Sequence, residues 1–394
     1  MQEFDGIRPY SDEETTAAFT RLVQDPEFID LIARFKSPRL SRWFPRLVRM
    51  RVKAWMHEKF GGLTRIDDIQ AQLSSHVAAL VDKTTTRVTQ SGLERLDKQS
   101  AYLFISNHRD IVFDPMVVNY LLYSQGFSTT RIAIGDNLLQ NRLFAELMRL
   151  NKSFIVRRNM TSPREMRDAY LLLSSFICHS IDTNHSIWIA QREGRAKNGI
   201  DQTDPAIIKM FYMCRKKSGL AFDEAMNRMH IVPVSISYEY DPCDADKARE
   251  LEARAREGSY TKTEGEDTEQ ILKGLTGFKG RVHVHFGSPI KDSPDNPKAL
   301  ATRIDNEMNA NYHLHASNLV AYQQRAQQDA AHGPADMLAG LVTADTWSDT
   351  DLAAAEEHLN RRLNACAPAQ RPYLRDMYAN PVASALKAQS GSEQ

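Results

Sequence analysis

The sequence predicts an α/β fold in which a central, mostly parallel sheet is flanked by helices, with helical extensions at both ends. Between residues 99 and 290, short apolar runs alternate with segments of helical periodicity, which is the pattern of strands joined by helical crossovers. Residues 1–98 and 291–394 show helical patterning with charges of both signs. The 394-residue chain is long enough to bury a large core. We therefore expect three regions: a helical region at 1–98, the sheet domain at 99–290 and a helical extension at 291–394.

The candidate strands of the sheet domain are six apolar runs. In chain order they are AYLFIS, RIAIG, KSFIVR, SIWIA, IVPVSISY and RVHVHFG, with candidate helices at 113–125, 140–150, 163–181, 204–217 and 219–229. Residues 241–278 are rich in charged side chains, and we expect them to form an exposed insertion before the last strand. Proline is disfavoured in central strands, so Pro233 predicts that its strand lies at an edge or carries a bulge.

The composition excludes several classes of protein. Lys and Arg number 50 and Asp and Glu also number 50, so the formal net charge is zero and no nucleic-acid partner is expected. The four cysteines, Cys178, Cys214, Cys243 and Cys366, form no Cys-x-x-Cys pair, which predicts reduced thiols in a cytoplasmic protein. No apolar run reaches the roughly 18 residues of a membrane span, and the acidic N-terminal stretch is unlike a secretory signal. We expect a protein that is soluble or lies on a membrane surface, with no metal site and no cofactor.

Residues 41–60, SRWFPRLVRMRVKAWMHEKF, predict a basic amphipathic helix with Pro45 in its first turn. On a helical wheel its apolar face holds Phe44, Leu47, Val48, Val52 and Trp55, and its basic face holds Arg42, Arg46, Arg49 and Lys53. Arg51 interrupts the apolar stripe and Phe60 lies outside it. A helix of this kind suits the surface of an anionic membrane. The alternative is a helix packed on the protein's own core, with its basic face in water.

The run YLFISNHRDIVFDPMVVNYLL places His108, Asp110 and Asp114 between a predicted buried strand and a predicted helix. Ligands of α/β sheets bind at this carboxyl end of the strands. A carboxylate that accepts a hydrogen bond from one imidazole nitrogen leaves the other nitrogen free to remove a proton from a hydroxyl, as a general base does. The alternative is structural, with His108 filling a polar loop and Asp110 capping the helix.

Four stretches in order, SNHRDIVFDP, KSFIVRRN, REGRAKNG and IVPVSISYE, resemble the successive blocks of the glycerol-3-phosphate / lysophosphatidate acyltransferase superfamily. The second and fourth blocks are closer to the glycerol-3-phosphate acyltransferase branch. The resemblance implies an acyltransferase domain that transfers a fatty acyl group from acyl-carrier protein or acyl-coenzyme A to a glycerol-phosphate-type acceptor in phospholipid biosynthesis. A lipid product suits an enzyme bound peripherally to the anionic inner face of the cell membrane. The alternatives are another lysolipid or amino-acid lipid as acceptor, or a non-catalytic lipid-binding protein on the same fold.

Two of these blocks depart from the family pattern. The family separates its histidine and aspartate by four residues, whereas five separate His108 from Asp114, and Asp110 stands where the family often has serine. We predict that Asp114 is the partner of His108, with Asp110 as the alternative. In the third block Glu193-Gly194 runs directly into Arg195, where the family has a small residue between them.

The resemblance also implies residues that bind the substrate. A guanidinium group suits a phosphate, and strand alternation places Arg157 and Arg158 on opposite faces, so we expect one of them to meet the ligand. The resemblance implies that Arg157 contacts the acceptor phosphate. In the third block, Gly194 would permit a tight turn, Glu193 would hold a substrate hydroxyl or orient Arg195, and Arg195 and Lys197 would add positive charge for the phosphate. Pro233 would shape the acyl pocket. The alternative for these charged residues is an ordinary solvated strand end and turn.

Overall fold

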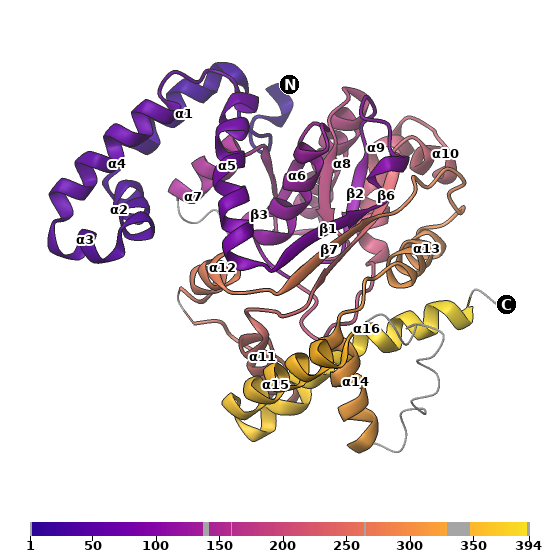
Figure 1. Cartoon of the computed structure of the whole chain (residues 1–394). Helices are drawn as coiled ribbons and strands as arrows, with labels where there is room; N and C mark the ends of the chain where they lie inside the picture. Colours follow the sequence, from indigo (N-terminus) through magenta and orange to yellow (C-terminus); the bar gives the residue numbers. More distant parts are fainter. Residues whose placement is uncertain (1, 137–141, 159, 264, 329–346, 392–394) are drawn as a thin grey trace.

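A seven-stranded sheet forms the centre of the molecule (Figure 1). The computed structural model describes residues 2–136, 142–158, 160–263, 265–328 and 347–391. The strands are β1 (Arg87–Ser91), β2 (Leu103–Ser106), β3 (Arg131–Gly135), β4 (Ser153–Val156), β5 (Ile187–Ala190), β6 (Ile231–Tyr238) and β7 (Arg281–Phe286). Their order is β1-β7-β6-β2-β5-β3-β4, and the pairs are parallel except β6 with β7. The predicted α/β fold class is confirmed.

Sixteen α-helices in the described part of the chain surround the sheet or extend from it. They are α1 (Asp12–Gln24), α2 (Pro26–Lys36), α3 (Pro38–Trp43), α4 (Pro45–Phe60), α5 (Ile66–Thr84), α6 (Phe113–Ser124), α7 (Arg142–Leu150), α8 (Pro163–Asp182), α9 (Pro205–Lys217), α10 (Phe222–Asn227), α11 (Asp244–Glu257), α12 (Glu266–Thr276), α13 (Pro297–Ala310), α14 (Ala316–Gln328), α15 (Asp349–Ala365) and α16 (Arg371–Gly391). Alternate strand residues face two cores, one shared with α5 and α6 and the other with α8, α9 and α13.

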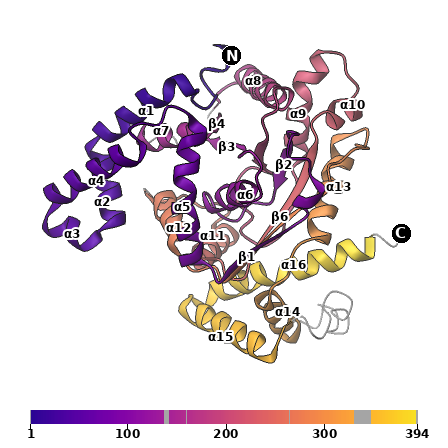
Figure 2. The same ribbon diagram turned by 45° about the horizontal axis from the view of Figure 1, so that its top comes forward.

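The helices at the two ends of the chain have cores of their own. Figure 1 shows α1 to α4 projecting from one side of the sheet, and their buried apolar residues pack with residues of α5 and α7. Figure 2 shows α14, α15 and α16 side by side, and their shared core includes Ala248 of α11. The division of the chain into three regions remains our proposal.

The six predicted strands are all present, but one strand was not predicted. Residues 87–91 form β1 within a region that we expected to be helical. This short strand contains Val88 as its single large apolar residue, so it lacks the apolar run that identifies the others. It forms because it pairs with β7, which is distant in sequence. The predicted helix at 219–229 is shorter, as α10, and residues 140 and 141 of the predicted helix 140–150 lie outside the described residues.

The position predicted for Pro233 is wrong. Its strand β6 lies between β7 and β2, and the pairing from Val234 to Tyr238 is regular, so Pro233 is neither at an edge nor in a bulge. The ladder with β7 ends at Val234, and the Pro233 carbonyl accepts a hydrogen bond from the Gly287 nitrogen at 2.8 Å, where the chain has left β7. The proline nitrogen lies on that same side, so its missing N–H removes no hydrogen bond from the ladder.

The expectation of an exposed insertion at 241–278 holds for only part of the segment, such as residues 254–259. This segment forms α11 and α12, and it buries the charged residues Asp244, Lys247, Glu250 and Glu266. Some of their charged partners lie outside the segment: Glu250 pairs with Lys197, and Asp244 pairs with Arg362 of α15. Because buried charges are stable only when they are paired, these side chains bind the segment to its neighbours, and composition alone does not indicate this.

Candidate active site

His108 and Asp114 meet at the carboxyl end of β2. The loop 107–112 connects β2 to α6, and the first turn of α6 carries Asp114. His108 Nδ1 lies 2.8 Å from Asp114 Oδ2, and the imidazole packs edge-on against Trp188 of β5 with ring centroids 5.7 Å apart. The Asp114 side chain is fully buried, whereas the His108 side chain is 16% exposed. The hydrogen bond engages Nδ1, which leaves Nε2 as the nitrogen that can exchange a proton with a substrate.

The Asp114 carboxylate is held by several donors. Its Oδ2 also accepts hydrogen bonds from the backbone nitrogens of Arg109, at 2.6 Å, and Asp110, at 2.9 Å. Its Oδ1 accepts a hydrogen bond from the hydroxyl of Tyr238, the last residue of β6. These donors hold the carboxylate of Asp114 in place beside His108.

Asp110 has a different task in this structure. Its Oδ1 accepts hydrogen bonds from the backbone nitrogens of Val112, at 3.0 Å, and Phe113, at 2.8 Å, which caps the start of α6. Its Oδ2 faces Gly274 of α12 so closely that a Cβ there would lie 1.9 Å away. Burial, with the nearby Asp114 charge, raises the pKa of Asp110. The fifth residue between His108 and Asp114 is therefore accommodated in a turn that Asp110 caps, and the contact with His108 is made by Asp114.

Two residues that the sequence analysis did not single out hold the histidine loop in place. The side-chain amide of Asn107 bonds both backbone groups of Ile236 in β6, at 2.8 and 3.0 Å, and also bonds Asp201 at 2.9 Å. The Arg109 guanidinium pairs with the same carboxylate of Asp201 at 2.7 Å. In the sequence these two polar residues flank His108, which could have suggested that they position it. Their shared partner, Asp201, could not be inferred, because it lies more than ninety positions away in the chain.

The third block lies directly beside the histidine loop. The Ala196 nitrogen donates to the His108 carbonyl at 2.8 Å, and Gly194 takes a positive φ of 76°, as a tight turn requires. Arg195 is buried and donates from one terminal nitrogen, Nη2, to the side-chain oxygen of Gln270 in α12. Its other terminal nitrogen, Nη1, is buried and has no hydrogen-bond partner among the described residues. A buried donor of this kind is costly unless a ligand accepts from it.

The third block also lines a pocket of about 580 Å³. The basic residues around it are Arg192, Arg195, Lys197 and Arg254. Glu250 of α11 pairs with both Lys197 and Arg254, so much of their charge is already balanced. Burial lowers the pKa of Lys197. The pocket is also lined by the acidic residues Glu193 and Asp204, and the basic residues Arg192 and Arg195 make it suited to an anion.

Arg157 and Arg158 lie at the end of β4, and their side chains take different directions, as strand alternation predicts. Arg158 lies 3.5 Å from the exposed carboxylate of Glu193, so it faces the third block. Arg157 lies beside Gly6 of the N-terminal segment. The structure therefore brings Arg158, rather than Arg157, next to the third block.

Pro233 lies away from the histidine loop. It is five residues before Tyr238 in β6, and side chains alternate along a strand, so the two face opposite sides of the sheet. Tyr238 belongs to the core of α5 and α6, whereas Ile231, which shares the face of Pro233, belongs to the other core. A role for Pro233 in the acyl pocket remains a prediction.

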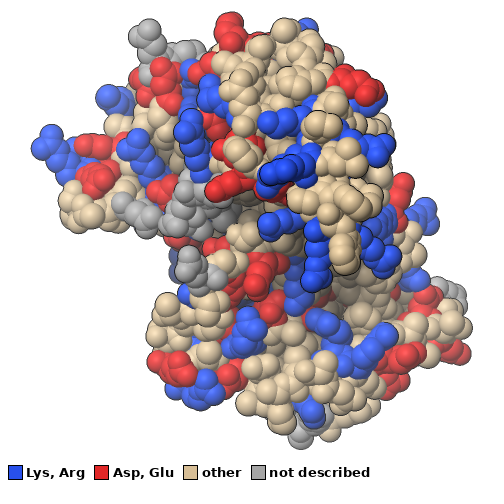
Figure 3. All heavy atoms as spheres, turned by 90° about the vertical axis from the view of Figure 1, so that its left-hand side faces the viewer, with Lys and Arg blue, Asp and Glu red and all other residues tan. Residues whose placement is uncertain are grey.

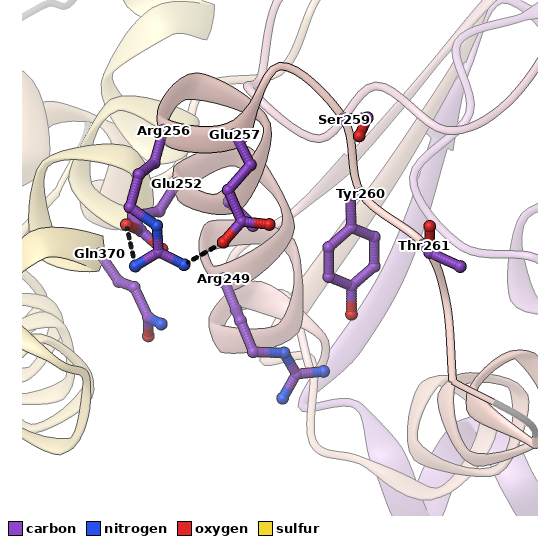
Figure 4. A pocket seen from close by; sticks show the side chains of 9 residues that line it. Arg249, Glu252, Arg256, Glu257, Ser259, Tyr260, Thr261 and Gln370 are labelled. Atoms are coloured by element: carbon purple, nitrogen blue, oxygen red, sulfur yellow. Dashed lines mark hydrogen bonds and ion pairs between the residues drawn. The ribbon is translucent and has the colours of Figure 1, made fainter.

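Another pocket, of about 480 Å³, lies between α11, the loop that follows it and Gln370 (Figure 4). Arg256 in this pocket pairs with Glu252 at 3.1 Å and with Glu257 at 2.8 Å. The residues that line it include none from the histidine loop or the third block. Within the described ranges, no three or more His, Cys, Asp or Glu side chains are grouped so that they could hold a metal ion.

Comparisons with known proteins give matches over the part of the chain that contains the histidine loop. Residues 87–237 match the family model described as Acyltransferase. The dihydroxyacetone phosphate acyltransferases of Bos taurus and Mus musculus are 22% and 23% identical to this chain over 210 and 209 residues. Each alignment covers 52% of this chain but 29% of the relative, so the chain spans less than a third of those proteins' length.

A solved structure, the 1-acyl-sn-glycerophosphate (LPA) acyltransferase PlsC from Thermotoga maritima, aligns with a TM-score of 0.36 and 11% identity over 72% of this chain and 92% of that chain. That likeness is too distant to bear on function. The family match, by contrast, confirms the resemblance predicted from the sequence blocks, since it spans them from SNHRDIVFDP to IVPVSIS. Residues 87–237, which carry His108 and Asp114, therefore match the acyltransferase family.

Proposed function

We propose that this chain transfers a fatty acyl group from an acyl thioester to a hydroxyl of a glycerol-phosphate-type acceptor, such as glycerol-3-phosphate or lysophosphatidate. The observation that carries the proposal is the 2.8 Å contact between His108 and Asp114 at the carboxyl edge of an acyltransferase-family sheet. Dihydroxyacetone phosphate is a further acceptor to test, because the two curated relatives are named for it.

In the proposed reaction His108 acts as a general base. Its Nε2 removes the proton of the acceptor hydroxyl while that oxygen attacks the thioester carbonyl and a C–O bond forms. Asp114 stabilises the imidazolium that results. The tetrahedral intermediate then collapses, the C–S bond breaks, and the departing thiolate takes the proton from His108. The products are an ester and a free thiol, and acyl-carrier protein or coenzyme A supplies the thiol.

We propose that the pocket of the third block binds the acceptor phosphate. The buried Nη1 of Arg195 lacks a partner among the described residues, and the neighbouring Arg192 and Arg158 can add positive charge. A phosphate held there would position a hydroxyl for His108, because Ala196 in the same segment is hydrogen-bonded to the His108 backbone. Glu193 pairs with Arg158 and can also accept from a substrate hydroxyl.

We propose that the N-terminal helices bind the enzyme peripherally to an anionic membrane, on its inner face. The predicted apolar face of residues 41–60 is divided: Val48 and Val52 are buried with Met56 and Phe60, and Trp55 is half-buried. Phe44 and Leu47 are exposed. The exposed set, termed here the apolar tip, is Leu40, Trp43, Phe44, Leu47 and Met50, with exposed fractions between 52% and 77%. A contiguous apolar surface with basic neighbours suits a membrane interface.

The charge distribution agrees with this proposal. Figure 3 views the molecule from the side of the N-terminal helices and shows Lys and Arg side chains gathered near the centre of that face. The basic residues beside the apolar tip are Arg39, Arg42, Arg46, Arg49 and Lys53. Arg49 is paired with Asp30 at 2.5 Å. No helix in the described part of the chain is both long enough and apolar enough to cross a bilayer.

Incubation of the purified chain with acyl-coenzyme A or acyl-carrier protein and a panel of acceptors tests the function. The panel holds glycerol-3-phosphate, dihydroxyacetone phosphate, lysophosphatidate, other lysophospholipids and an amino-acid lipid, and mass spectrometry identifies the products. We expect an acylated glycerol phosphate from the wild type and none from His108→Ala. Thioester consumption without an acylated acceptor would indicate hydrolysis, and binding without consumption would indicate a lipid-binding protein.

A further inference from the structure

The two oxygens of the Asp114 carboxylate have partners from different parts of the chain. Oδ2 accepts from His108 and from two backbone nitrogens of the histidine loop. Oδ1 accepts from the hydroxyl of Tyr238, which is its one hydrogen-bond donor within the described residues. Asp114 is 0% exposed, so solvent cannot substitute for this donor. The rotation of the carboxylate about its Cβ–Cγ bond therefore depends on Tyr238 as well as on the loop.

The register of β6 places Tyr238 where it can make this contact. Asn107 bonds both backbone groups of Ile236, which fixes β6 against the end of β2. Tyr238 follows two residues later on the same face, at the level of the first turn of α6. Its ring packs edge-on against Phe113 with centroids 5.8 Å apart. The strand, the loop and the helix thus converge on one carboxylate.

Tyr238 keeps its proton in this environment. Burial and the negative charge of Asp114 raise the pKa of Tyr238 well above its usual range. The phenol therefore acts only as a hydrogen-bond donor to Asp114 at any pH at which the protein works.

We propose that Tyr238 is a positioning residue that acts on His108 through Asp114, and this inference rests on the proposed acyl transfer. The hydroxyl holds the carboxylate in the rotation in which Oδ2 orients the His108 imidazole toward the acceptor hydroxyl. Without the hydroxyl, Oδ1 is a buried acceptor with no donor, and the carboxylate turns toward other donors. His108 then spends less time in the productive orientation, which slows the chemical step but leaves the substrate contacts intact.

Tyr238→Phe tests this role, because phenylalanine fills the same space without the hydroxyl. Losing one hydrogen bond to a charged group should lower kcat about tenfold and change KM by less than about twofold. The matched control is Tyr102→Phe. Tyr102 is buried to the same extent, 6% exposed, in the same core, and its hydroxyl accepts from the Asp97 nitrogen at 2.9 Å, beyond the opposite end of β2. The control should retain the kcat of the wild type.

A double-mutant cycle distinguishes action through Asp114 from an independent effect. In an Asp114→Asn background, adding Tyr238→Phe should change the residual rate little. An equal loss in both backgrounds, or a Tyr238→Phe enzyme with the kcat of Tyr102→Phe, would overturn the inference while the proposed function stands. A wild type that transfers no acyl group overturns the proposed function, and the inference falls with it.

A measurement independent of turnover completes the test. In 15N-histidine-labelled protein, the His108 Nδ1–H should exchange slowly with solvent in the wild type and in Tyr102→Phe, and faster in Tyr238→Phe. Equal exchange rates would contradict the role. If Tyr238→Phe unfolds at the assay temperature, a fluorotyrosine incorporated at position 238 replaces it: a changed kcat at constant KM supports the inference, and an unchanged kcat overturns it.

Discussion

The Arg109 guanidinium and the Asp201 carboxylate lie 2.7 Å apart inside the protein, and each side chain is 6% exposed. The pair joins the histidine loop to the segment that follows the third block. Arg109 also donates to the carbonyls of Ala196 and Gly199, at 3.3 and 3.4 Å. The orientation of His108 is therefore coupled to the shape of the pocket that we propose for the phosphate.

Arg109→Ala should destabilise the protein strongly. Removing one member of a buried pair leaves Asp201 without its cation, and the free energy of unfolding should fall by about 3–5 kcal/mol. Urea denaturation followed by circular dichroism measures this. The control is Arg167→Ala, which breaks an exposed pair with Asp168 and should cost about 1 kcal/mol or less. If the two variants lost similar amounts of unfolding free energy, the buried pair would contribute no more to stability than the exposed pair.

His108→Ala should lower turnover at least about 100-fold, because the general base is lost. Asp114→Asn should also be severely impaired, because an amide cannot stabilise the imidazolium as a carboxylate does. Acyl transfer is measured with purified variants whose melting temperatures match the wild type, and His76→Ala, an exposed histidine on α5, is the control. Near-normal turnover in His108→Ala would exclude the mechanism.

Asp110 should behave as a helix cap with an unfavourable buried charge. Asp110→Ala should cost about 1 kcal/mol of stability because the hydrogen bonds to Val112 and Phe113 are lost. Asp110→Asn keeps an oxygen for those bonds and should retain turnover. If only Asp110→Asn and not Asp114→Asn abolished turnover, the assignment of the His108 partner would be reversed.

The stability of the wild type relative to Asp110→Asn should depend on pH. The pKa of Asp110 is raised above its ordinary value of 3.8, so the folded state holds this proton more tightly than the unfolded state. The wild type should therefore lose stability relative to Asp110→Asn as the pH rises through the raised pKa, and the difference should be constant below pH 3.8. Urea denaturation across this range tests the sign. A wild type that gained relative stability with rising pH would contradict it.

Arg195→Ala should raise the KM for the acceptor about tenfold or more, with a smaller effect on kcat, if its guanidinium binds the phosphate in ground and transition states alike. Gln270→Ala should raise the same KM less, because it removes the hydrogen bond that orients Arg195. Arg157→Ala and Arg158→Ala are compared in the same assay. An unchanged acceptor KM in Arg157→Ala would remove Arg157 from the site, and we expect the larger effect from Arg158→Ala.

Binding to acidic vesicles should have two components, one from the basic residues beside the apolar tip and one from the apolar tip itself. The basic residues contribute about 1 kcal/mol each near an anionic surface, so binding should weaken with added salt. The apolar side chains should leave a salt-resistant remainder, which Trp43→Glu with Leu47→Glu should remove. Trp55, on the predicted apolar face, is not replaced in this test. Lys36 Nζ lies 2.9 Å from the centroid of its ring, so a substitution there would also break a contact within the protein.

Vesicle sedimentation at low and high salt measures both components of binding. Phe278→Glu is the control, because Phe278 is similarly exposed, 53%, but belongs to the segment between α12 and β7. Wild-type protein that ignores acidic vesicles at low salt would refute the proposal.

The sequence by itself determined six of the seven strands and the position of the histidine loop. The six apolar runs form strands because each is apolar enough to be buried. Most of them are separated by a helix, and strands that alternate with helices form a mainly parallel sheet with helical crossovers. His108 could be placed at the carboxyl end of β2 because a strand pattern ends just before it and a helical pattern begins just after it. The amphipathic segment also became a helix, since its pattern is local.

The tertiary structure decided which side chains meet. β1 and the central position of β6 depend on pairing with β7, and the burial of 241–278 depends on charges whose partners lie elsewhere in the chain. The contacts of Tyr238 with Asp114 and of Gln270 with Arg195 join residues 124 and 75 positions apart. Local periodicity reports which face of an element is apolar. It does not report the partner of a buried polar group, because that partner is chosen by the packing of the whole chain.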